Sequence, residues 1–529
     1  MINVNEDNKS LKEMHKSVSI VHLVCISFFY VCAGPFGQGE AIAAGGAKWT
    51  FIFTIIVPIV FSIPLALISS EQASRFPACG GCAEWGLILG KFVGTLNTYV
   101  RTLCSIFDNA IYPVMVFDYL IALIPKMNRS IYKFIVVLVS NSLVLFLNIS
   151  GLETVGSVSF ILTIIIILPI LLFFFFGASK ITADKIFADK PSKYGPVDWP
   201  LLLSTLIWQY SGFDTIAALS EETKNPKRSF PIALSITIVL VTLVYLLPTI
   251  SGLSVEPDLD KWKSSAFSEI SKKLPHCENG WLSICISVAG IFSALSLLNI
   301  AISCTGRETY ASALLDSFPF SSFLARLDNN MKHQPLPIVS LTFMSLMTIP
   351  FSFFDFSILV EWSGLLTVIQ QMIQIASFIA LRSPSMVERM KREQAELRQR
   401  AGIVDSQSSE QDIIRIELPN SDEDDDENES KNENSNENDF VEDLSNKFII
   451  PGGWFGVAIV CLPLLAISVF LCIVQGWISL LACSIMIAGL FLIKEIEIEV
   501  RKFIEIDRAH SPNDAQTMNE DTHDIAEII

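Results

Sequence analysis

Helix-breaking residues and acids interrupt two segments of the chain that are otherwise apolar. The first segment contains Gly34-Pro35-Phe36-Gly37 followed by Glu40, and the sixth contains Ser211-Gly212-Phe213-Asp214. Such breaks expose backbone N–H and C=O groups in the middle of a membrane, where they can line a substrate cavity. A simple kink at proline or glycine is the alternative. Because the two breaks occupy matching positions and each has an acid close by, we favour a substrate-binding site that includes these residues.

Acidic side chains inside the apolar segments are a second source of chemistry. A charged side chain is costly inside a bilayer, so acids at such positions commonly serve a function. The acids concerned are Glu40, Glu71, Asp108, Asp214 and Glu361. Glu71 precedes Arg75 by one helical turn, which favours an ion pair with a structural role. For Asp108 and Asp214, a direct function and pairing with a base such as Arg101 are equally open. Glu40, Asp108 and Asp214 are the candidates for exchanging a proton.

Three aromatic side chains flank the breaks, namely Phe36, Trp208 and Phe213. An aromatic ring at such a place could close over a substrate or stack on a cation. Packing in the core is the alternative for each of them.

The elements that must position these residues are apolar helices long enough to span a bilayer. Hydrophobic residues make up 51% of the 529-residue chain and charged residues only 17%. Stretches such as Ile161 to Gly177 carry no charge and are apolar on every face, unlike the helices of a soluble protein. Because about 20 such residues span a bilayer, we predict an all-α membrane protein with about twelve transmembrane helices.

The apolar runs between charged or Pro/Gly-rich segments place these spans along the chain. The predicted spans are 18–46, 51–70, 91–123, 131–147, 155–177, 200–219, 230–253, 281–304, 337–353, 357–381, 454–474 and 478–493. Breaks in the first and sixth spans are typical of a five-plus-five inverted repeat formed by helices 1 to 10, to which helices 11 and 12 are added.

Charged segments divide the chain further. The predicted parts are a cytoplasmic N-terminal tail (1–17), an inverted-repeat transport core (18–382), a cytoplasmic charged helix with an acidic disordered insert (383–446), helices 11 and 12 (447–494) and a cytoplasmic C-terminal tail (495–529). Residues 422–443 hold twelve acids against the single Lys431, so they supply −11 of the net charge of −17. Basic residues after the tenth span place both termini in the cytoplasm. The insert is either a passive linker or a regulatory region.

The sequence also disfavours several classes of function. Cys79 and Cys82 form a CxxC without a second cysteine pair or nearby histidines, so we expect no metal. Since no nucleophile–base set is evident, we expect no catalytic residues, no cofactor and no enzyme activity. The charge is confined to one insert, so nothing predicts a nucleic-acid partner. The lipid bilayer is the expected environment, with the plasma membrane favoured over an intracellular membrane.

With these residues the chain resembles the amino acid–polyamine–organocation superfamily, and within it the polyamine:proton symporters of plants and protozoa. The motifs typical of the polyamine branch are Gly34-Pro35-Phe36-Gly37 and Asp108-Asn109-Ala110-Ile111-Tyr112-Pro113. The motifs shared with the whole superfamily are Glu71 with Phe76-Pro77 and Gly80-Gly81, Glu222 with Asn225-Pro226, and Pro451-Gly452-Gly453. The similarity covers residues 18–493 apart from the insert. The chain departs from the branch at Gly39, where a glutamate is usual, and at Phe213, which replaces a tryptophan.

The resemblance implies a secondary transporter that imports polyamines such as putrescine or spermidine together with protons. Chemistry at the first break supports a small cationic substrate, because Pro35 removes an N–H donor that could bind a carboxylate and Glu40 follows nearby. The first alternative is an amino acid permease, cationic or neutral, on the same fold. The second is a transporter-like nutrient receptor that signals through the insert. The loop 125–130 contains no cysteine, so we expect no disulfide-linked heavy chain.

Overall fold

The computed structural model describes most of the apolar chain. The described residues are 19–32, 34–35, 37–76, 81–149, 152–220, 223–263, 265–326, 336–390, 392, 449–474 and 477–510. Within them, eight helices are long and apolar enough to cross a membrane, and shorter apolar helices accompany these eight. The N-terminal tail, the acidic insert, Phe36, Cys79, Glu221 and Glu222 lie outside the described residues.

Every predicted span coincides with one helix or with two or three consecutive helical segments. The membrane helices are α1 (Ile20–Val31), α2 (Gln38–Val57), α3 (Ile63–Arg75), α5 (Lys91–Leu123), α6 (Ser130–Ile149), α7 (Leu152–Gly177), α9 (Trp199–Gln209), α10 (Pro226–Val255), α12 (Trp281–Leu314), α14 (Ile338–Phe351), α15 (Phe356–Ala380), α19 (Gly453–Val474) and α20 (Trp477–His510). The predicted all-α membrane fold is therefore confirmed. Helix α2 joins the end of the first span to the start of the second, because Gly46 (φ 73°) turns the chain inside it.

Both predicted helix breaks are present. The first separates α1 from α2, which begins after Gly37 in the left-handed region (φ 71°). The second separates α9 from the short 3-10 helix η7 (Thr215–Leu219), and it contains Gly212 at φ 98°. A Cβ atom on Gly212 would lie 2.6 Å from the ring of Tyr30. Glycine is thus required there both by the backbone angle and by the close approach of the two breaks.

The contacts between helices repeat with an offset of five spans. Helix α7 packs against α1 and α12, and its counterpart α15 packs in the same way against α9 and α5. Since five is an odd number of spans, the second set of helices runs through the membrane in the opposite sense to the first. This arrangement is the inverted repeat that the two breaks predict.

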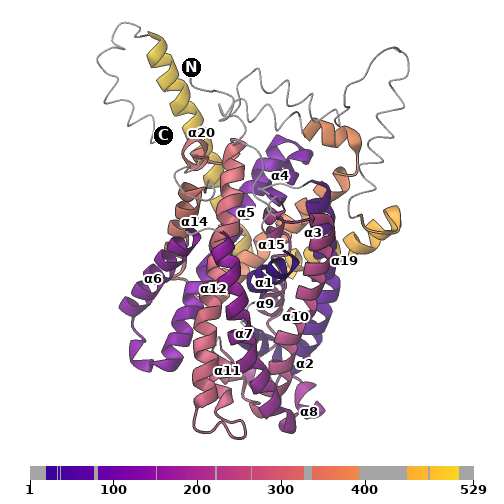
Figure 1. Ribbon diagram of the computed structural model, residues 1–529, viewed down its shortest axis with the longest axis vertical. Coiled ribbons are helices and arrows are strands. Elements are labelled where there is room, and N and C mark those ends of the chain that lie inside the picture. Colours follow the sequence, from indigo (N-terminus) through magenta and orange to yellow (C-terminus); the bar gives the residue numbers. More distant parts are fainter. Residues whose placement is uncertain are drawn as a thin grey trace.

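Two groups of helices emerge from these contacts. We call α1, α2, α3, α9 and α10 the bundle, and α5, α6, α12 and α14 the scaffold. We count η7 with the bundle because it follows α9 in the same broken helix, although it also packs against α12. Figure 1 shows α6 and α14 of the scaffold on one side of the molecule and α2, α3 and α10 of the bundle on the other. Helix α15 packs against both groups, through α9 and through α5. Any site between bundle and scaffold is therefore walled by α15 as well.

Two helices are longer than predicted. Helix α12 continues past Cys304 to Leu314, and α20 continues past Ile493 to His510. The extension of α20 is bound to the segment that follows α12, because Lys494 Nζ donates to Asp316 Oδ1 over 2.7 Å and Glu497 Oε2 accepts from the Phe320 N–H over 2.8 Å. The continuation of α12 places Glu308 on a membrane helix instead of in a loop.

Two long connections cover the end of the bundle at which α2 turns. In the connection from α10 to α12, the carbonyl oxygen of Lys263 lies 2.2 Å from the position that a Cβ atom on Gly39 would take. In the connection from α7 to α9, Lys190 Nζ donates to the carbonyl oxygen of Ala44 over 2.8 Å. A glutamate is usual at position 39 in the family branch that the chain resembles. Its side chain would not fit against Lys263 in this arrangement.

We expect Gly39→Ala to destabilise the protein, because a methyl group would overlap a backbone carbonyl that cannot rotate away. Overpacking of this kind costs about 1–3 kcal/mol. Thermal unfolding of the purified protein in detergent measures the change. The matched control is Gly489→Ala in α20, where no other atom lies within 4 Å of the added Cβ, so alanine should be neutral or slightly stabilising. Equal melting temperatures for the two variants would contradict the close packing at Gly39.

Candidate functional site

A cavity lies where the two helix breaks face α5 and α15. The space inside it, including the part that is open to solvent, is about 570 Å³. The residues that line it are Tyr30, Val31, Cys32, Arg101, Cys104, Ser105, Asp108, Tyr112, Trp208, Ser211, Gly212, Asp214, Thr215, Leu297, Ser363, Thr367 and Gln370. The cavity therefore lies between the bundle and the scaffold. A site between two such groups of helices can change its access when the groups move against each other.

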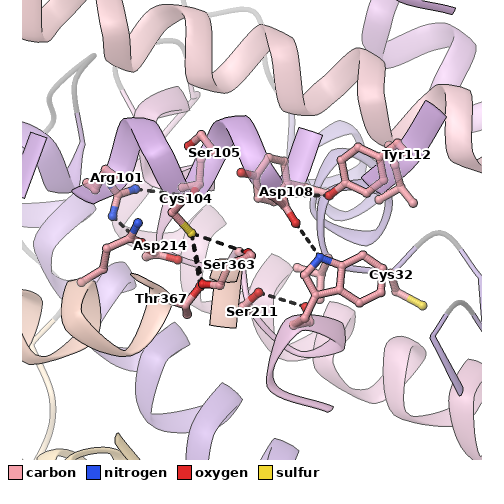
Figure 2. A pocket seen from close by; sticks show the side chains of 17 residues that line it. Cys32, Arg101, Cys104, Ser105, Asp108, Tyr112, Ser211, Asp214, Ser363 and Thr367 are labelled. Atoms are coloured by element: carbon pink, nitrogen blue, oxygen red, sulfur yellow. Dashed lines mark hydrogen bonds and ion pairs between the residues drawn. The ribbon is translucent and has the colours of Figure 1, made fainter. Parts of the chain in front are cut away.

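Asp108 marks one end of the cavity. Its Oδ1 accepts a hydrogen bond from Trp208 Nε1 over 2.5 Å, and its Oδ2 accepts one from Tyr112 Oη over 2.8 Å. Figure 2 shows the Asp108 carboxylate and the Tyr112 hydroxyl pointing toward each other. In the part of the chain that the structure describes, no basic side chain forms an ion pair with Asp108. Within the described residues, the carboxylate is therefore oriented by two neutral donors and is not paired with a basic side chain.

A cluster of three charged side chains marks the other end. Arg101 donates from one guanidinium nitrogen to Asp214 Oδ2 over 2.9 Å and from the other to Glu308 Oε1 over 2.8 Å. All three side chains are buried. Arg101 precedes Asp108 by seven residues on α5, which is two helical turns or about 10 Å. Figure 2 accordingly shows Arg101 and Asp214 together and apart from Asp108.

Neutral polar side chains form the wall between the two ends. Ser363 and Thr367 of α15 lie beside Cys104 Sγ, at 3.7 and 3.4 Å, and Gln370 follows one turn later. The spacing i, i+4, i+7 puts the three α15 side chains on one face of that helix. With Asp108, Asp214 and Glu308 ionised against the single Arg101, this region carries two net negative charges. Such a cavity favours small cations over anions.

The structure brings half of the predicted site residues into this cavity. They are Asp108, Tyr112, Trp208, Ser211, Gly212 and Asp214. Phe213 is fully buried away from the cavity, and Gly37 packs against Trp208 and Thr205. Gly34 and Pro35 line a smaller apolar pocket beside Tyr119. The predicted role of these residues as direct cavity contacts thus has no support in the geometry, because the break turns their side chains to other neighbours.

Glu40 and Glu361 also lie apart from the cavity. Glu40 is partly buried in the first turn of α2, and Glu361 is partly buried on α15. Neither lines the cavity in this structure. Their prediction as functional acids rested on their position in apolar segments, which does not specify the direction of a side chain.

Several cavity residues were not predicted from the sequence. They include Tyr30, Cys32, Thr215, Ser363, Thr367, Gln370 and, beside the cavity, Glu308. The polar stripe Ser363-Thr367-Gln370 was a detectable signal, since its helical spacing in an apolar span indicates a polar face. Glu308 was missed because α12 was expected to end before it.

Glu71 belongs to a separate cluster at the end of α3. Its carboxylate accepts from Arg75 over 3.0 Å, from Arg382 over 2.6 Å and from the backbone N–H of Ile450 over 2.8 Å. The exposed fraction of the Glu71 side chain is 1%. The cluster joins the ends of α3 and α15 to the segment that leads into α19, which is a structural arrangement.

The chain is similar in sequence to proteins named as transporters. A sequence model of the amino acid permease family matches residues 17–393. A probable polyamine transporter of Arabidopsis thaliana is 28% identical over 374 residues, which cover 69% of this chain and 72% of the relative. A polyamine transporter of Oryza sativa subsp. japonica is 28% identical over 374 residues, 69% of this chain and 67% of the relative. The low-affinity putrescine importer of Escherichia coli (strain K12) is 23% identical over 279 residues, 50% of this chain and 59% of the relative.

We expect Trp208→Phe to impair the cavity without unfolding the protein, because it keeps an aromatic ring but removes the donor to Asp108. A hydrogen bond to a charged group contributes about 1.5–3 kcal/mol, and without it the Asp108 carboxylate can turn away from the cavity, so the affinity for a ligand held by Asp108 should fall. Binding to the purified protein measures the effect. Trp199→Phe is the control, because Trp199 packs against Trp49 and Phe53 and does not line the cavity. Equal affinities for the two variants would refute the role of the Trp208 hydrogen bond.

Proposed function

The chain belongs to the amino acid permease family, and on that premise we propose that it imports polyamines, small organic cations such as putrescine and spermidine, together with protons. Transport across a membrane is common to the family and to the named relatives. The chain is therefore a multi-pass membrane transporter and not an enzyme. The proposal adds the cargo, the direction of transport, the coupling ion and the cellular membrane.

One observation supports the cationic cargo, namely that no basic side chain among the described residues forms an ion pair with Asp108. Tyr112 and Trp208 orient the carboxylate but leave its charge uncompensated. A buried carboxylate is stabilised by an opposite charge within a few ångströms. The ammonium group of a polyamine supplies that charge and three N–H donors. An amino acid would also bring a carboxylate, and the guanidinium that could bind it, Arg101, already holds two acids.

The remainder of the cavity suits the rest of a polyamine. Its methylene chain would lie against Tyr30, Leu297 and the ring of Trp208. The Trp208 ring packs edge-on against the Phe356 ring, with 5.6 Å between the two ring centroids. Apolar walls between separated acids match a molecule in which methylenes join separated ammonium groups. The relatives named as polyamine or putrescine carriers support the same class of cargo.

Transport would proceed by alternating access, with the bundle moving against the scaffold around the cavity. Asp108 and Asp214 are the acids in the cavity that could carry the coupled proton, and Glu40 remains a candidate outside it. Proton entry down its gradient would then drive cation entry. The positive-inside pattern supports cytoplasmic termini, and the proposed location is the plasma membrane.

Competition for uptake tests the cargo. We expect unlabelled putrescine and spermidine to suppress uptake of radiolabelled putrescine by cells that express the protein, whereas arginine and leucine should not. Uptake should be faster at acidic than at neutral external pH, because a larger inward proton gradient drives a symporter, and a protonophore should abolish the difference. Displacement by arginine or leucine but not by putrescine would instead identify an amino acid permease.

Neutralising the cavity acids tests the site. We expect Asp108→Asn to reduce putrescine uptake at least about a hundredfold, because it removes the charge that binds the ammonium group while keeping the shape of the side chain. Asp214→Asn should also abolish uptake. Asp355→Asn is the control, since Asp355 is an exposed acid at the start of α15 that does not line the cavity. Surface protein is quantified in parallel, and normal uptake by Asp108→Asn would remove this residue from the site.

A further inference from the structure

Arg101 is a cation that the protein itself places in a cation-selective cavity. Its guanidinium lies between Asp214 and Glu308, and both Arg101 and Asp214 line the cavity. An arginine cannot lose its charge as a carboxylate can. The protein therefore supplies one positive charge of its own at the end of the cavity opposite Asp108.

The two ion pairs of Arg101 connect different parts of the fold. Arg101 is on α5 and Glu308 is on α12, two scaffold helices that pack along each other extensively. Asp214, in contrast, immediately precedes η7 in the broken helix of the bundle. A movement of the bundle against the scaffold would keep the Arg101–Glu308 pair intact, but it would change the distance between Arg101 and Asp214. When the distance between Asp214 and Arg101 increases, Glu308 remains as an ion-pair partner, so Arg101 is not left unpaired inside the protein.

We propose that Arg101 occupies, in the empty carrier, the position at Asp214 that an ammonium group of the cargo takes when the carrier is loaded. Glu308 is the positioning residue that retains Arg101 after this exchange. The proposal rests on the proposed function, because it requires an amine cargo. Asp108 holds the first ammonium group, and the second displaces Arg101 from Asp214. Loading thereby releases the broken helix from the scaffold.

The exchange makes the carrier sensitive to the number of charges on its cargo. A diamine such as putrescine reaches both Asp108 and Asp214. An alkyl monoamine of the same length, n-butylamine, binds Asp108 but leaves the Arg101–Asp214 pair closed. We therefore expect n-butylamine to displace bound putrescine from the wild-type protein without being taken up itself. Uptake of n-butylamine at a rate close to that of putrescine would overturn the proposal, and this comparison needs no variant.

Two substitutions should change putrescine affinity in opposite directions. Arg101→Met removes the competing cation, so the dissociation constant for putrescine should fall at least about tenfold while net uptake is lost. Glu308→Gln leaves the displaced Arg101 without its retaining acid, so the dissociation constant should rise at least about tenfold. Arg307→Met is the control, because the Arg307 guanidinium binds Ser303 on its own helix and does not line the cavity. Equal weakening by both substitutions, which a purely structural cluster predicts, would overturn the proposal.

A cargo-free measurement separates this proposal from the proposed function. If wild-type protein neither binds nor imports putrescine or spermidine, the polyamine function is wrong. The role of the ion pair between Asp214 and Arg101 of the scaffold can then be tested with Cys32 and Cys104, which line the cavity. Both cysteines are labelled with a small thiol reagent, and the labelled peptides are mapped by mass spectrometry. Labelling should be several-fold faster in Arg101→Met than in Arg307→Met. Equal rates would show that Arg101 does not hold the cavity closed.

Discussion

Charges buried within a membrane must be paired, and this requirement explains how the interior of the protein is arranged. An unpaired charge is strongly unfavourable where neither water nor lipid can solvate it. Arg101 satisfies the requirement through Asp214 and Glu308, and Glu71 satisfies it through two arginines. Both clusters join helices that are distant in sequence, so charge pairing also fixes which helices meet. Asp108 departs from this pattern within the described residues, since the donors that contact it, Tyr112 and Trp208, are neutral, and this departure is the basis for the role that we propose for it.

The membrane made the fold predictable from the sequence. A span must be long and apolar, so the spans follow from hydropathy, and the two breaks follow from Gly34-Pro35 and Ser211-Gly212 inside such spans. The lengths of α12 and α20 could not be predicted in the same way. These helices continue beyond the apolar region, where charged residues such as Lys494 and Glu497 resemble a loop to a hydropathy argument. The contacts of Lys494 with Asp316 and of Glu497 with Phe320 show that the charged continuation is part of the packed structure.

The site was less predictable because hydropathy does not specify where a side chain points. Asp108 and Asp214 were found because acids are conspicuous in apolar segments, and both line the cavity. Glu40 was equally conspicuous but lies elsewhere. The side chains around the first break were expected to line the cavity together, yet a break that turns the chain sends neighbouring residues in different directions. Tyr30 therefore faces the cavity, whereas Gly34 and Pro35 line a separate apolar pocket.

Asp108 and Asp214, the acids at the two ends of the cavity, differ in their partners. Asp214 pairs with Arg101, whereas Asp108 is contacted by the neutral donors Tyr112 and Trp208. A cavity that presented two bare carboxylates would be costly to maintain without cargo. By placing Arg101 at one of them, the protein stabilises the empty cavity and leaves a single charge, that of Asp108, uncompensated. A cargo with one charge could complete the electrostatics of this cavity but could not separate Arg101 from Asp214. A cargo with two charges could do both, so in the proposed exchange the Arg101–Asp214 pair would also distinguish diamines from monoamines.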